Sequence, residues 1–159
     1  MKNILSLLLL MGFIIACQPK PAQQAADSPE TLAYDSLLAA ELGADQYGMR
    51  TYVMANLIAG PIRSQDSLEA ARLQRAHLDN ITRMAEEGTL VLAGPFMDNK
   101  EVRGIYIFAV ETVEEAEALT NTDPAIQAGR LKMELRPWYG SAALMKLGEI
   151  HSQITKEKI

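Results

Sequence analysis

Cysteine and histidine are scarce in this chain of 159 residues, which contains one cysteine and two histidines. A single cysteine excludes an internal disulfide, and two histidines without HxH or HxxxH spacing do not make a zinc-binding motif. The 15 basic residues are outnumbered by 20 acidic ones, for a net charge of −5. Nucleic-acid binding normally needs a basic patch, which this balance does not supply. We therefore expect no metal site and no nucleic-acid partner.

Motifs for nucleotides and for hydrolytic nucleophiles are also missing. The sequence has no Rossmann glycine fingerprint, no P-loop and no G-x-S-x-G turn. Neither a dinucleotide site nor a serine-hydrolase site of the usual kind is indicated, and we expect no cofactor.

The N-terminal segment has the pattern of an export signal. Lys2 precedes an apolar run over residues 4–15, which is too short for a typical membrane span. The run ends in an Ile-Ile-Ala-Cys motif at Cys17, which resembles the cleavage box of bacterial lipoproteins. The resemblance implies cleavage after residue 16, lipidation of Cys17 and an extracytoplasmic protein anchored to the outer membrane or the periplasmic face. An ordinary secretory signal with an unmodified cysteine is the alternative.

The rest of the chain divides into four predicted parts. Residues 17–30, rich in Pro, Ala and Gln, predict a flexible tether. Residues 31–50 form a helical appendage, introduced by Ser28-Pro29 and ending at Gly43. Residues 51–139 form the main domain, and residues 140–159 a C-terminal extension that is helical near 142–151.

The main domain follows the order strand, helix, strand, strand, helix, strand. Capping boxes at Asp66 and Thr112 start the two helices. This order is that of the ferredoxin-like fold, an α+β arrangement with a four-stranded antiparallel sheet. The predicted strands cover residues 51–59, 89–93, 104–110 and 131–136, the last one closed by Pro137-Trp138, and the helices cover 66–88 and 112–121.

The strands over residues 89–93 and 104–110 are apolar on both faces. In a ferredoxin-like domain the two helices cover only one face of the sheet. Since the chain has no second sheet, we expect a second copy to cover the other face, in a face-to-face homodimer.

His77 lies in the apolar stripe of the helix predicted over residues 66–88. At about 100° per residue, it shares one face with Ala70, Leu73, Ile81 and Met84. An imidazole aimed at a packed surface needs a partner. A core histidine bonded to a backbone carbonyl is one interpretation, and a functional histidine is the other.

Several short motifs together resemble the YciI-like (YCII-related) family of dimeric α+β barrel proteins. The similarity covers about residues 52–138 and leaves the signal, the tether and both extensions outside it. The motifs are His77, AGPF at residues 93–96, RGIYIF at 103–108, EEAEA at 114–118, DPA at 123–125, GR at 129–130 and PW at 137–138.

The family resemblance implies a His–Asp pair in a cleft, formed here by His77 and Asp123. A carboxylate that binds one ring nitrogen fixes the tautomer, so that the other nitrogen can move a proton. Asp123 also precedes Pro124 in the pattern of a helix N-cap, and the two roles can coexist. At least one relative removes chloride from a chlorinated hydroxyquinol, which suggests proton-assisted elimination or isomerisation of a small ring compound.

We assign contacts to such a small-molecule ligand to Asn56, Arg63 and the Gly94-Pro95-Phe96 segment. Most of these residues have a plainer interpretation. Gly-Pro pairs commonly end strands, and arginines such as Arg63 and Arg103 are commonly solvated. Phe96, like Trp138, fits a core or an interface. Arg130 begins an alternating series of charged residues, typical of the solvated face of an edge strand. The rival to an enzyme is a non-enzymatic ligand-binding or structural lipoprotein, in which His77 only satisfies a buried hydrogen bond.

Overall fold

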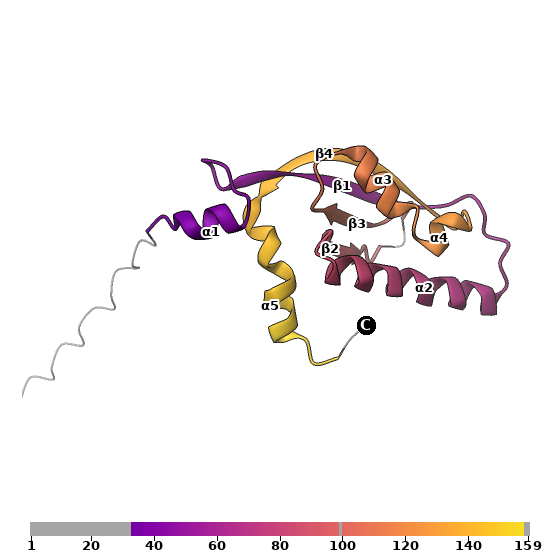
Figure 1. Ribbon diagram of the computed structural model, residues 1–159. Coiled ribbons are helices and arrows are strands. Elements are labelled where there is room, and N and C mark those ends of the chain that lie inside the picture. The colour runs from indigo at the N-terminus through magenta and orange to yellow at the C-terminus, as the bar shows by residue number, and fades with distance from the viewer. Residues whose placement is uncertain (1–32, 99, 158–159) are drawn as a thin grey trace, which may run out of the picture. The chain divides into compact units, whose positions relative to one another are not determined.

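A four-stranded antiparallel sheet with the strand order β2-β3-β1-β4 organises the protein (Figure 1). The computed structural model describes residues 33–98 and 100–157, and the folded unit begins at Tyr34. The α+β, ferredoxin-like class expected from the element order is confirmed. The elements are α1 (Ser36–Glu41), β1 (Met49–Ala59), α2 (Ser67–Glu86), β2 (Leu90–Pro95), β3 (Val102–Phe108), α3 (Val113–Thr120), α4 (Pro124–Gln127), β4 (Leu131–Ser141), the 3₁₀ helix η1 (Ala142–Lys146) and α5 (Leu147–Ile154).

The two main helices begin where the capping signals lie. The Asp66 side chain accepts a hydrogen bond from the Glu69 amide at the start of α2. At the start of α3, Thr112 and Glu115 bond each other's backbone amides in a reciprocal capping box. After α2, Gly88 adopts a φ of +74°, a left-handed conformation that ends helices at low cost for glycine.

The last strand is longer than predicted. Pro137-Trp138 does not end β4, which continues to Ser141 and keeps its pairing with β1 through Pro137 opposite Val53. Because β4 lies at the edge of the sheet, half of its backbone amides face away from any partner strand. A proline, which has no amide hydrogen, is therefore tolerated in it.

The segments outside the main domain are partly described. The helix expected to end at Gly43 is present as α1, but it is short and begins after Asp35, whose carboxylate caps it. The C-terminal extension is helical, as η1 and α5. The predicted signal, the tether, Cys17 and the Ser28-Pro29 start lie outside the described residues. Within the described part, no helix has the length and apolarity of a membrane span.

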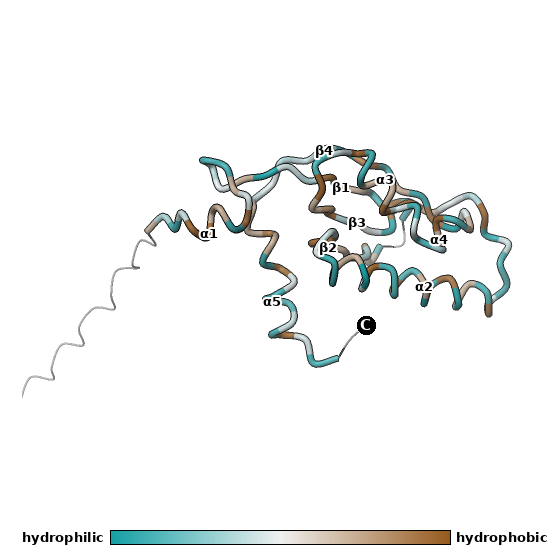
Figure 2. Tube along the Cα trace, viewed as in Figure 1, coloured by the Kyte–Doolittle hydropathy of each residue, from teal (hydrophilic) through white to brown (hydrophobic). Residues whose placement is uncertain are grey.

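The main core lies between the sheet and the helices α2 and α3. Figure 2 shows hydrophobic and hydrophilic residues alternating along α2, as expected for a helix with one buried face. Both the sheet and the helices contribute side chains to this core: Val53, Ala55, Met84, Leu90, Tyr106, Phe108 and Ala116.

The opposite face of the sheet is partly covered by the chain itself. Tyr52 and Ile107, which alternate with the helix-facing residues, are buried. Since η1 contacts β1 and β2, and α5 contacts β2, the C-terminal extension covers this end of the face. The expectation that only a second copy can cover this face is thus wrong for that end. Further along, Met54 and Ile105 remain half-buried, and the homodimer stays a prediction.

Two glycines at the β2–β3 contact give a test of this packing. A Cβ on Gly104 would lie 2.4 Å from the carbonyl oxygen of Gly94, whereas a Cβ on Gly94 would meet nothing within 4 Å. We expect Gly104→Ala to lower the free energy of unfolding by about 1–3 kcal/mol, because β2 must move away. Gly94→Ala should change it by less than about 0.5 kcal/mol. Urea denaturation of both variants checks this, and equal effects would contradict the proposed strand contact.

Candidate active site

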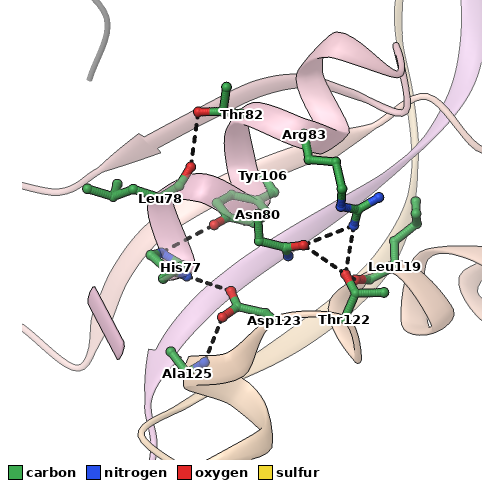
Figure 3. Close-up of polar contacts among 10 residues, drawn as sticks. All are labelled: His77, Leu78, Asn80, Thr82, Arg83, Tyr106, Leu119, Thr122, Asp123 and Ala125. Atoms are coloured by element: carbon green, nitrogen blue, oxygen red, sulfur yellow. Dashed lines mark hydrogen bonds and ion pairs between the residues drawn. The ribbon is translucent and has the colours of Figure 1, made fainter. Parts of the chain in front are cut away.

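His77 and Asp123 form a buried pair beneath the helical layer (Figure 3). Nδ1 of His77 lies 2.5 Å from Oδ2 of Asp123, and the two residues are 5% and 0% exposed. So short a contact is typical of a charge-assisted hydrogen bond. The pair joins α2 to the loop before α4, which are 46 positions apart in the sequence.

Local backbone geometry places Asp123. It is the N-cap of α4, with Pro124 at the first helical position, and its Oδ1 accepts the Ala125 amide at 2.8 Å. Its other oxygen, Oδ2, bonds His77. The capping and pairing roles therefore coexist, one on each carboxylate oxygen.

A neighbouring polar cluster fixes the loop that carries Asp123. The side-chain oxygen of Asn80 accepts bonds from Arg83 at 2.9 Å and from Thr122 at 3.1 Å (Figure 3). Asn80 is buried on α2, three residues after His77, and its position on the buried face was not predicted. Its spacing from His77 was the available signal, since residues three apart share a helix face.

Tyr106 is the third residue of the site, beside His77 and Asp123. It was not predicted as a site residue from the sequence. Its hydroxyl lies 3.4 Å from Nε2 of His77, and the two rings stack with centroids 6.3 Å apart. Burial, together with the nearby charge of Asp123, raises the pKa of the Tyr106 phenol far above its usual value. Its hydroxyl therefore stays protonated. The sequence does contain a signal for Tyr106: a tyrosine in an otherwise apolar strand carries a hydroxyl that needs a hydrogen-bond partner when it is buried.

The partners of His77 define what its ring can do. With Nδ1 against a carboxylate, the neutral imidazole carries its hydrogen on Nδ1 and keeps an electron pair on Nε2. A hydrogen bond of 3.4 Å is long for a hydroxyl donor, so Tyr106 holds this electron pair only weakly. His77 is thus bonded to side chains, and the arrangement is suited to accept a proton at Nε2.

A cavity of about 270 Å³ opens beside His77. Three of the predicted ligand contacts, Arg63, Pro95 and Phe96, line it together with His77. The exposed side chains of Arg63 and Phe96 leave it open to solvent. The cavity therefore brings residues from β1, β2, β3, α4 and the segments before α2 and β4 to one imidazole.

Two predicted contacts are not among the lining residues. Asn56 pairs with Ile105 in the sheet and alternates with the helix-facing Ala55 and Leu57, so it lies on the opposite face. Gly94 lies in β2 next to the lining residue Pro95. Of the predicted segment over residues 94–96, Pro95 and Phe96 line the cavity.

A larger hollow of about 440 Å³ lies elsewhere, beside Asp45, Arg50 and Tyr139. The Asp45 carboxylate accepts the amides of Tyr47 and Met49 and the hydroxyl of Tyr139, so it serves to fold this turn. Among the residues that the structure describes, no three His, Cys, Asp or Glu side chains are grouped to hold a metal ion. The His77 cavity is the better candidate for chemistry.

One family of known proteins matches the part of the chain that holds this site. The family model of the YCII-related domain matches residues 54–139, which include His77, Tyr106 and Asp123. Because this match spans more than half of the chain, the protein belongs to the YCII-related family. No curated protein matches the chain.

The His77–Asp123 contact is testable by a double-mutant cycle. His77→Asn and Asp123→Asn should each lower the free energy of unfolding, because each leaves a buried partner unpaired. In the double variant the loss should fall short of the sum by about 0.5–3 kcal/mol. The same cycle on the exposed Glu69–Arg72 pair is the control and should show much smaller coupling. Additive losses at His77 and Asp123 would contradict the pairing.

Tyr106 gives an alkaline test. A phenol whose pKa is raised by folding stabilises the protein below the pKa of the unfolded state, and this contribution is lost as the pH rises above about 10. We expect the free energy of unfolding to fall between pH 9 and 11 by less in Tyr106→Phe than in the unchanged protein. Urea denaturation at both pH values measures this. Equal losses in the two proteins would refute the buried phenol.

Proposed function

We propose that this member of the YCII-related family is a cofactor-free enzyme that moves a proton on a small ring compound, in an elimination or an isomerisation. One observation carries the proposal: His77 is held by Asp123 through Nδ1 and also lines a cavity. A histidine kept only for stability would have no need of a cavity that solvent can enter.

In this mechanism His77 is the general base and Asp123 its positioning residue. Nε2 accepts a proton from the substrate, and the electron pair of the broken bond forms a new double bond. In an elimination the leaving group departs with its own electron pair; in an isomerisation Nε2 returns the proton to another atom. The nearby carboxylate of Asp123 stabilises the imidazolium in between.

Tyr106 supports the ring of His77 during this transfer. Its hydroxyl can donate to neutral Nε2 and can turn to accept from Nε2 once the imidazole is protonated, because a phenol both donates and accepts. The stacked phenol also limits the orientation of the imidazole. The weak bond at Nε2 is displaced at small cost when a substrate proton takes its place.

Two further parts of the proposal come from the sequence. We propose a homodimer that uses the half-buried part of the second sheet face around Met54 and Ile105. We also propose anchoring to a bacterial membrane through lipidated Cys17, with the domain on the extracytoplasmic side. The apolar run and its closing motif support this anchoring.

Proton transfer by His77 can be measured without knowing the product. In heavy water, a base that removes a carbon-bound proton exchanges it for deuterium, which NMR detects across a panel of small ring compounds. We expect exchange with the full chain, and a loss of at least about 100-fold in His77→Asn. His151→Asn, which removes the exposed histidine of α5, is the matched control and should keep full exchange.

The rival function predicts a different pattern. If His77 only satisfies a buried hydrogen bond, no compound of the panel exchanges, and His77→Asn changes stability alone. That pattern would favour a ligand-binding or structural protein. Circular dichroism of each variant separates lost folding from lost exchange.

A further inference from the structure

We infer that the cavity beside His77 recognises a carboxylate carried on a small apolar ring, an inference that rests on the proposed function and specifies its substrate class. Three arginines line the cavity together with His77: Arg63, Arg103 and Arg130. The lining contains no aspartate or glutamate. The nearby Asp123 is fully buried behind the imidazole, with both oxygens engaged.

The three arginines come from different parts of the fold. Arg63 lies in the segment between β1 and α2, Arg103 lies in β3, and Arg130 immediately precedes β4. Arg130 was expected on a solvated face, but it is half-buried and lines the cavity. Arg63 and Arg130 bring two like charges to one hollow, and a bound anion lowers the energy of their mutual repulsion.

Hydrogen bonds to backbone and side-chain oxygens hold two of these arginines in place before any ligand binds. The Arg130 carbonyl accepts from the Gly60 amide at 2.8 Å and from Nη1 of Arg63 at 3.2 Å. Nη1 of Arg130 in turn donates to Gln65 at 3.2 Å. Because each guanidinium has five N–H donors, these bonds leave other donors for an anion. Arginine forks of this kind match the geometry of a carboxylate.

Apart from Gln74, the remaining lining is apolar and suits a ring. The apolar residues are Leu57, Pro95, Phe96, Ala125 and Leu131, of which Phe96 is partly exposed to solvent. A volume of about 270 Å³ accommodates a compound with a single ring rather than an extended chain. Positive groups near the ring also lower the energy of the anion that forms when His77 removes a proton.

Binding of benzoate and benzamide to the full chain, measured by calorimetry, tests this inference. The two compounds share a ring and differ in charge. We expect benzoate to bind at least tenfold more tightly than benzamide, and Arg63→Gln and Arg130→Gln each to weaken benzoate binding about tenfold or more. Arg72→Gln, an equal loss of charge on the exposed side of α2, is the control and should bind benzoate normally.

The outcomes separate this inference from the proposed function. Equal binding of benzoate and benzamide, or benzoate binding that survives both arginine substitutions, would overturn the inference. Arginine-dependent benzoate binding without deuterium exchange on any ring carboxylate supports the inference and contradicts the enzyme. Exchange confined to uncharged compounds supports the enzyme and overturns the inference.

Discussion

The contact between Nδ1 of His77 and the carboxylate of Asp123 is the interaction on which the site depends. It fixes the ring tautomer and ties α2 to the loop before α4. Because the second oxygen of Asp123 caps α4, the same side chain that orients the imidazole also orders the backbone leading to Arg130 and β4. Stability and proposed chemistry are therefore supported by the same atoms, and a change at Asp123 affects both.

The ferredoxin-like arrangement explains why these residues meet. The sheet order brings β3 next to β1 in the centre, so that Tyr106 faces α2 at the level of His77. The segments before α2 and before β4 bond each other at Gly60 and Arg130, and each of them contributes an arginine to the cavity lining. The His77–Asp123 pair and the charged groups of the cavity thus converge from elements that are far apart in the sequence.

Much of the fold could be predicted, because capping boxes, glycine turns and alternating apolar residues act locally. The end of β4 was predicted wrongly, although the alternating charges indicated an edge strand. Such a strand tolerates a proline, and β4 continues past Pro137 because β1 extends opposite it. The contact between His77 and Asp123 was predicted, through the family resemblance. Tyr106, Asn80 and Arg130 were missed as site residues because their partners lie on other elements. The cover of Tyr52 by the C-terminal extension was missed for the same reason.

Nitrogen NMR of the imidazole ring of His77 tests the central claim most directly. The chain has only one other histidine, so His151→Asn leaves a single ring to observe. If Asp123 holds the ring, the neutral imidazole carries its hydrogen on Nδ1 with Nε2 unprotonated, and Asp123→Asn weakens this preference. A hydrogen found on Nε2, with Nδ1 bare, would contradict the account, since the nitrogen assigned to accept the proton would then be occupied.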